Sequence, residues 1–213
     1  MMQDHERHFG TIEATGEGKV TTRPDVANIR LGISTDAKTA REATAQNAVV
    51  AGRIIDAIRK VGIDADAIQT VGLSLGPIYE WDDVNKRSVL VGYRTGNVVA
   101  VRAPVGKAGE VYDAGFEAGA NEGGGVTFGL SDDRAARREA MAEAADLAHR
   151  ECQLVARTLG VTLRGPVEVQ ILDGGGPRSV EFTGLRKAEG TPVMAGEIQV
   201  SERVRVVYQT KAG

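Results

Sequence analysis

The stretch GGGVTFGLSDDRAARREAMAEAADLAHRECQLVARTLGV, residues 123–161, decides how this chain is expected to fold. It predicts a strand over 126–130, a sharp turn, and then one long helix. Ser131 is expected to be the N-cap, and the two aspartates after it stand in the first turn, where carboxylates favour the positive end of the helix dipole. Gly160 is a typical C′ residue and predicts the end of the helix.

The buried face of this helix is predicted to be narrow and made mostly of small side chains. A helix with such a face packs closely and flatly, as it does against a sheet. No pair of chemically reactive side chains shares one face of the helix, so the stretch predicts an architecture and gives no sign of a reaction. The predicted buried positions step by three or four: Met141, Ala145, Ala148, Cys152, Val155 and Leu159.

The composition is that of an ordinary soluble globular protein of 213 residues, with 42% hydrophobic and 26% charged residues. Only 4% of the residues are aromatic, so aliphatic side chains must build the core. The formal net charge of −3 argues against a nucleic-acid partner, because proteins that bind phosphate backbones usually carry a basic patch.

Cys152 is the single cysteine, so no disulfide can form within the chain. No apolar run approaches the length of a transmembrane segment. The first ten residues, MMQDHERHFG, contain no apolar core of a secretory signal. On this basis we expect a cytoplasmic protein, with the periplasm as the alternative if the sequence is trimmed or starts at the wrong residue.

The remaining pattern predicts strands that come in hairpins, with helices between the groups. Thr39-Ala40-Arg41-Glu42 reads as a capping box for a helix that runs to Val61. The segment 26–35 is expected to pair antiparallel with 9–20. A slip of the alternation is expected near Ser201. Expected strands cover 9–20, 26–35, 68–79, 89–101, 126–130, 167–172 and 197–209, and a shorter helix covers 104–119.

We therefore predict an α+β fold in which a largely antiparallel sheet carries helices packed on one face. A hairpin near 80–88 is expected to protrude from it. Residues 1–9 are expected to be a disordered tail and residues 10–210 a single domain. The Gly/Pro-containing polar loop 173–193 is long enough to be functional or mobile.

An ordered set of short strings resembles the SIMPL-domain family, which includes YggE-like and outer-membrane immunogenic proteins. The resemblance covers residues 10–210, and the order of the strings makes it specific. The strings are TGEG (15–18), RPDVA (23–27), GIDADAIQT (62–70), LSLGPIYEW (73–81), VGYRTGN (91–97), AGAN (118–121) and AGEIQVSERVRVVYQ (195–209), with the strand–helix unit 126–161 between the last two.

The resemblance implies an α+β fold with helices packed on a sheet. It also implies a cell-envelope or stress-associated role and, in some members, assembly into large rings. No catalytic residue, cofactor or metal ligand follows from it. Many bacterial members begin with an export signal, which this sequence does not show.

Candidate chemistry in the sequence has a simpler structural explanation in each case. His5 and His8 stand in the expected tail, where a metal site would lack supporting residues. His149 is expected to be partly buried or on the surface, and Cys152 to lie in the core. Glycines 16 and 18 precede a strand, so they indicate a bulge or a close backbone approach and not a phosphate loop.

The candidate interface residues are Tyr79, Trp81, Asp82, Asp83 and Tyr93, at or beside the tip of the expected hairpin. An exposed tryptophan is costly unless something covers it, and tryptophan is enriched at interface hot spots. Packing on its own hairpin and contact with another subunit remain open for Trp81. The acidic residues at the tip are expected to be solvated.

The sequence thus predicts a non-enzymatic protein that self-associates or binds a protein partner, with ring-like homo-oligomers as the expected form. Edge strands and the 79–93 hairpin are expected to meet neighbouring subunits, and a terminal strand at 197–209 or 11–20 to offer an edge. One alternative is a small-ligand carrier in which the 173–193 loop closes over a pocket. Another is an enzyme of unknown type.

Overall fold

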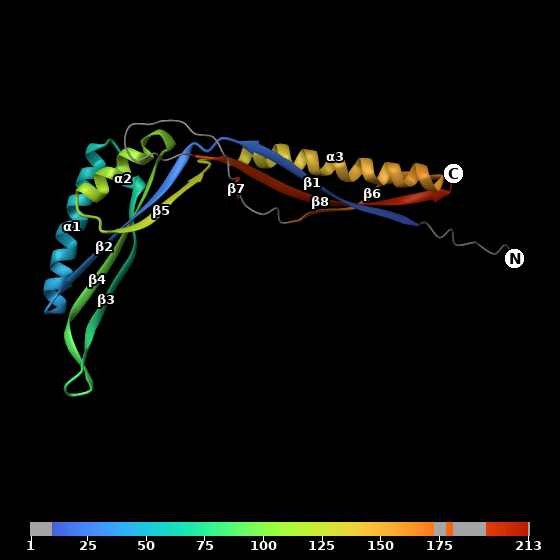
Figure 1. Cartoon of the computed structure of the whole chain (residues 1–213). Coiled ribbons are helices and arrows are strands. Elements are labelled where there is room, and N and C mark those ends of the chain that lie inside the picture. Colours follow the sequence, from blue (N-terminus) through green and yellow to red (C-terminus); the bar gives the residue numbers. More distant parts are fainter. Residues whose placement is uncertain (1–9, 173–177, 181–194, 213) are drawn as a thin grey trace. The chain divides into compact units, whose positions relative to one another are not determined.

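The computed structural model describes residues 10–172, 178–180 and 195–212 (Figure 1). The described chain divides into two compact units. One unit contains residues up to 23, the segment 130–180 and the chain from 196 onward, and the other contains 24–129. Each unit has a sheet and a hydrophobic core of its own. The single domain expected over residues 10–210 therefore stays a prediction.

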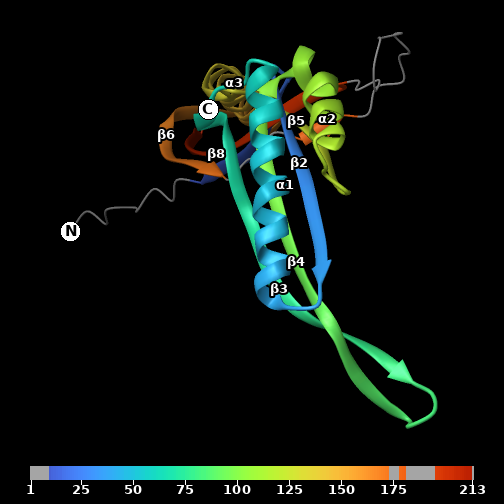
Figure 2. The same cartoon turned by 90° about the vertical axis from the view of Figure 1, so that its left-hand side faces the viewer.

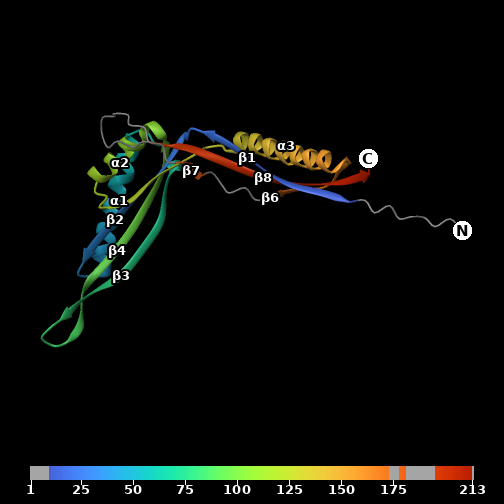
Figure 3. The same ribbon diagram turned by 45° about the vertical axis from the view of Figure 1, so that its right-hand side comes forward.

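The first unit is an antiparallel sheet in the order β1-β8-β6, with one helix on it. β8 also pairs with β7. Figure 3 shows α3 running along β1 and β8. The elements are β1 (Thr11–Thr22), α3 (Arg134–Leu159), β6 (Val161–Leu172), β7 (Arg178–Val180) and β8 (Glu197–Ala212).

The helix α3 packs closely on this sheet through small residues, as the sequence predicted. Two glycines of β1 make the approach possible, because a Cβ on Gly16 or Gly18 would lie about 2 Å from a carbonyl oxygen of α3. The predicted list of buried positions was partly wrong: Val155 and Leu159 are 42% and 66% exposed. The buried positions step strictly by four, as Ala140, Ala144, Ala148, Cys152 and Ala156.

The start of α3 differs from the prediction that Ser131 is its N-cap. The helix begins at Arg134, and Asp133 at the N-cap makes no side-chain hydrogen bond to the helix. The Asp132 carboxylate instead accepts the backbone N–H of Arg134 at 3.0 Å, which satisfies the first helical donor from outside the helix. Gly160 ends the helix as predicted, with φ +67°.

The strand β8 is central, because it pairs with β1 on one side and with β6 and β7 on the other. The expected edge at 197–209 was therefore wrong, whereas β1 in the described residues pairs only with β8 and forms an edge. The expected slip near Ser201 was wrong as well. The buried side chains of β8 occupy every even position from 198 to 210 without a break in the alternation. One of these positions holds a carboxylate, Glu202.

The second unit is an antiparallel sheet in the order β3-β4-β2-β5. Figure 2 shows α1 lying along β2 and β4. A helix and two short 3₁₀ turns complete the unit. The elements are β2 (Val26–Ala37), α1 (Ala40–Lys60), η1 (Ala65–Ala67), β3 (Ile68–Asp82), β4 (Arg87–Pro104), η2 (Val105–Lys107), α2 (Ala108–Glu117) and β5 (Glu122–Gly129).

The helix α1 has the predicted capping box, with the Thr39 side chain and the Glu42 side chain each accepting the other residue's backbone N–H. The helix ends at Lys60, and Gly62 follows with φ +86°. Its inward side chains close one face of the sheet over a core of aliphatic residues. The largest of these are Ile29, Leu31, Ile33, Ile54, Ile58, Val99 and Val101, all at or below 1% exposure.

Two further expectations were wrong in detail. The strand β2 does not pair with β1, because its partners are β4 and β5, and β1 takes β8 from the far end of the chain. Residues 178–180 form β7 where a loop was expected, and the rest of the 173–193 loop lies outside the described residues, as does the expected tail. The α+β class with antiparallel strands is confirmed, with the strands divided between two sheets.

Candidate interaction surface

The hairpin of β3 and β4 continues beyond the rest of its sheet. The last pair between β2 and β4 joins Ala37 to Tyr93, whereas β3 and β4 stay paired as far as Asp82 and Arg87. The outer part of the hairpin is therefore a two-stranded ribbon, which Figure 2 shows extending past the first turn of α1. Isolated two-stranded ribbons are at best marginally stable in water, so this one lacks the support that a third strand or a helix gives.

An apolar row follows one face of this hairpin, and we call it the hairpin stripe. It consists of Leu73, Leu75, Tyr79, Trp81 and Leu90, which are between 46% and 71% exposed. The four members on β3 share a face because they stand at alternate positions, and an irregularity near Val91 pairs Leu90 with Tyr79 on that same face.

The hairpin stripe continues the face that α1 covers farther along the sheet. Leu75 is paired directly with Thr95, and paired residues of antiparallel strands point to the same face. Thr95 is buried, and its hydroxyl lies 3.4 Å from the Thr44 hydroxyl of α1. The Asn47 amide of α1 donates to the Thr95 carbonyl at 3.0 Å. The stripe thus lies on the core-type face of the sheet, in a part that α1 leaves uncovered.

The five predicted interface residues do not all have the same role. Tyr79 and Trp81 are each 59% exposed and belong to the stripe. Tyr93 is half-buried and pairs with Pro77. Asp82 accepts the backbone N–H groups of residues 84 and 85 at 2.9 and 3.0 Å, so it fixes the turn. Asp83 is exposed and lies 3.6 Å from the Lys86 ammonium.

Sequence reasoning missed Leu73, Leu75 and Leu90 as members of this surface. The signal was present, because LSLGPIYEW places an apolar residue at nearly every second position. That pattern was interpreted only as a strand, with no assignment of which positions a helix covers. Only the tertiary structure decides that α1 covers the neighbouring strand β4 and leaves these positions open.

The acidic tip has a structural explanation. The side-chain and backbone donors of Asn85, followed by the backbone of Val84, hold the pKa of Asp82 below its usual range. Within the described ranges, no group of three or more His, Cys, Asp and Glu side chains gathers closely enough to hold a metal ion.

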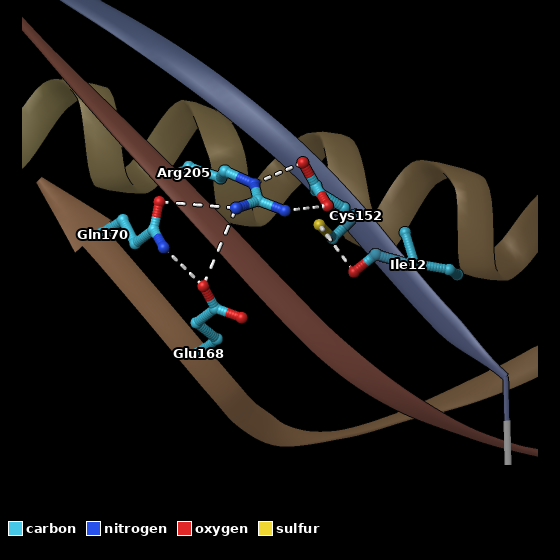
Figure 4. A network of polar contacts seen from close by, with 6 residues as sticks. Ile12, Cys152, Glu168, Gln170 and Arg205 are labelled. Carbon is cyan, nitrogen blue, oxygen red and sulfur yellow. Dashed lines mark hydrogen bonds and ion pairs between the residues drawn. The ribbon is translucent and has the colours of Figure 1, made fainter. Parts of the chain in front are cut away.

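Arg205 is the centre of a polar network on the open face of the first unit (Figure 4). From the central strand β8 it forms a bidentate pair with Glu13 of β1. It also donates to the side-chain carbonyl of Gln170 on β6 at 3.3 Å and lies 3.7 Å from the Glu168 carboxylate. The hydrogen bond from Arg205 holds the pKa of Glu13 below its usual range. The network ties three strands together.

Cys152 is fully buried, as predicted, with its sulfur 4.0 Å from the Ile12 carbonyl oxygen. Burial raises the pKa of this thiol, which is the opposite of what a nucleophile needs. His149 is half-buried, as predicted, and both of its ring nitrogens lie 2.7 Å from a partner, the Tyr208 hydroxyl and the Gln153 amide nitrogen.

The fold and this surface define a small antiparallel α+β protein with an uncovered apolar hairpin. Residues 12–208 match the sequence model of the SIMPL family, whose description is "Protein of unknown function (DUF541)". The chain therefore belongs to the SIMPL family.

Two relatives show how far the similarity extends. The chain is 31% identical to the 26 kDa periplasmic immunogenic protein of Brucella melitensis, over 94% of this chain and 84% of that protein. It is 27% identical to the uncharacterized protein YggE of Escherichia coli K12, over 93% and 82% respectively. In the described part of the chain, no helix is both long and apolar enough to cross a membrane.

Proposed function

We propose that this protein works without catalysis, as a self-associating protein whose copies meet through the hairpin stripe. The observation that carries the proposal is the stripe itself. Its five large side chains are exposed together on one face, whereas single exposed apolar residues are scattered on ordinary surfaces. Contiguous apolar surface of this kind marks an interaction site.

The occupant we favour is a second copy of the chain. The strand β3 is the edge of its sheet, so its outer backbone groups are available to a neighbouring strand. Two hairpins that meet edge to edge, or face to face, cover each other's tyrosine and tryptophan with apolar and aromatic side chains of the same stripe. Such a contact also gives the two-stranded ribbon the additional strand or the covering surface that it lacks within one copy. A ring-like assembly is one arrangement that such contacts produce.

The test is the mass of the purified chain in solution. We expect light scattering to give a multiple of the mass of one chain, 22.5 kDa, and the double variant Tyr79→Ser/Trp81→Ser to shift the population toward single chains. These side chains are exposed in one copy, so the variant is expected to keep its circular dichroism spectrum and its fold.

The matched control is Val49→Ser. Val49 is 63% exposed on α1 in the same unit and lies outside the stripe, so this change is expected to leave the mass unaltered. A single-chain mass for the unmodified protein at high concentration contradicts the proposal. An assembly that both variants leave intact contradicts the role of the stripe and locates the contact elsewhere.

We further propose that the protein acts in the cell envelope, since the name of its Brucella relative places that protein in the periplasm. A role in stress resistance remains a prediction from the family resemblance. Cell fractionation of the natural host, with antibody detection in the periplasmic and cytoplasmic fractions, tests the location. Recovery in the cytoplasmic fraction alone contradicts it.

A further inference from the structure

An open groove of about 510 Å³ lies beside α3 in the first unit. One wall is formed by the flank of the helix, including His149, Gln153 and Arg157. The other wall is the first half of β6, from Val161 to Pro166, and Tyr208 of β8 also lines the groove. The wall of β6 contains a register shift between Leu163 and Pro166.

A directed chain of hydrogen bonds ends in this groove. The Gln153 amide nitrogen lies 2.7 Å from Nε2 of His149, and an amide nitrogen can only donate. Nε2 therefore accepts, and the ring proton resides on Nδ1. Nδ1 lies 2.7 Å from the Tyr208 hydroxyl oxygen, so that oxygen accepts. The hydroxyl proton of Tyr208 is then left to donate to another group.

Tyr208 keeps this proton at neutral pH. Burial raises the pKa of its phenol above the ordinary value of 10.0, because the anionic form would be poorly solvated there. Tyr208 is only 9% exposed, because its ring packs in the hydrophobic core of the first unit.

The charge around this donor is positive. Arg157 and Arg164 both line the groove, and its lining contains neither Asp nor Glu. Guanidinium groups are planar and bind carboxylates with two parallel hydrogen bonds. The remaining walls include apolar surface, from Ala156, Val161, Leu163 and Pro166. The groove thus combines anion donors with a place for a short apolar group.

We propose that this groove binds a small organic carboxylate, with the carboxylate on the Tyr208 hydroxyl and Arg157 and the apolar part against the beginning of β6. The carboxylate accepts a hydrogen bond from the Tyr208 hydroxyl, whose own oxygen accepts from His149. This binding does not depend on the proposed self-association, because the two surfaces use different residues.

Benzoate is the probe, and binding is measured by titration calorimetry and by the shift in thermal unfolding temperature of the full chain. We expect saturable binding of benzoate and a raised unfolding temperature, since a ligand that binds only the folded state stabilises it. Tyr208→Phe keeps the ring and removes the donor, and Arg157→Gln removes the charge. Each is expected to weaken binding by about tenfold or more, as for a lost charge-assisted hydrogen bond.

The controls separate charge, shape and position. Benzamide, the uncharged analogue, is expected not to bind, and inorganic phosphate, which has no apolar part, is expected to bind more weakly than benzoate. Arg150→Gln changes an exposed arginine of the same helix outside the groove and is expected to leave benzoate binding unchanged. Circular dichroism confirms that each variant is folded.

Three results overturn the proposal. The first is an unmodified chain that does not bind benzoate at millimolar concentration. The second is benzoate binding that Tyr208→Phe and Arg157→Gln leave intact. The third is phosphate or benzamide binding as tightly as benzoate, which contradicts a carboxylate with an apolar part as the ligand class.

Discussion

Two glycines in β1 set the distance between α3 and its sheet. Gly16 and Gly18 are buried on the inner face of the strand. They lie against backbone atoms of Ala144 and Ala140, so glycine in the strand and alanine in the helix together allow the backbones to meet. Such a contact gains dispersion energy along the whole interface, and it leaves no room for a methyl group.

We predict that Gly18→Ala destabilises the protein by about 3 kcal/mol, because the new Cβ would stand 1.9 Å from the Ala140 carbonyl oxygen and the helix must move. Urea denaturation measures this change in unfolding free energy. The matched control is Gly52→Ala on α1, where a Cβ meets nothing within 4 Å. That change is expected to stabilise by about 0.5–1 kcal/mol, since alanine favours helix more than glycine does. Equal effects of the two changes contradict the close approach.

At the scale of elements, one ion pair joins α3 to the central strand. Glu202 occupies an inward position of β8 that its neighbours fill with apolar side chains, and its side chain is 5% exposed. Arg137 of α3 reaches it at 3.0 Å and also binds Asp133 at 2.7 Å. A carboxylate at this position needs its cation, because burial of an unpaired charge is strongly unfavourable.

We predict that Arg137→Met costs about 1–3 kcal/mol of unfolding free energy, because Glu202 stays inside without its partner. The double variant Arg137→Met/Glu202→Leu is expected to recover most of this loss, since it leaves no charge on the inner face and restores the apolar alternation of β8. Thermal and urea unfolding of the single and double variants measure both changes. A double variant that is less stable than Arg137→Met contradicts this account, because the Glu202 side chain would then stabilise the fold even without its arginine.

Across the whole molecule, several surface carboxylates depend on a fixed donor in the folded state. The pKa of Glu13 is held low by Arg205, and that of Asp36 by Arg94. The pKa of Asp132 is lowered mainly by the Arg134 side chain and then by its backbone. These carboxylates occur in both units, so acid acts on the two sheets together.

We predict that stability is constant from pH 7 to about pH 5 and then falls toward pH 2. A carboxylate whose folded pKa is depressed contributes stability above its unfolded pKa, 4.5 for glutamate and 3.8 for aspartate, and loses it as the pH falls through the folded value. Urea midpoints at each pH measure the curve. Glu13→Gln is expected to flatten its acid limb, and an unchanged limb contradicts the role of the Arg205 pair.

The sequence predicted those features that depend on near neighbours in the chain. The Thr39 capping box, the end of α3 at Gly160 and the small residues of its buried face follow from local hydrogen bonding and helical spacing. The ordered strings also identified the family. The aromatic residues of the hairpin stripe were recognised as candidates because an exposed tryptophan is unusual on any fold.

Only the tertiary structure decided which strands pair and where their covering helices end. Alternation is the same for a strand that pairs with its neighbour and for one that pairs with the far end of the chain, so the pairing of β1 with β8 was not predictable. A charged residue at position 202 suggested a slip of the alternation near Ser201, and only the contact with Arg137 explains why Glu202 can face inward. Leu73 and Leu75 form a contact surface only because they lie on the edge strand β3, which α1 leaves uncovered there. The groove at Tyr208 exists because β8, from the far end of the chain, lies beside α3 and β6.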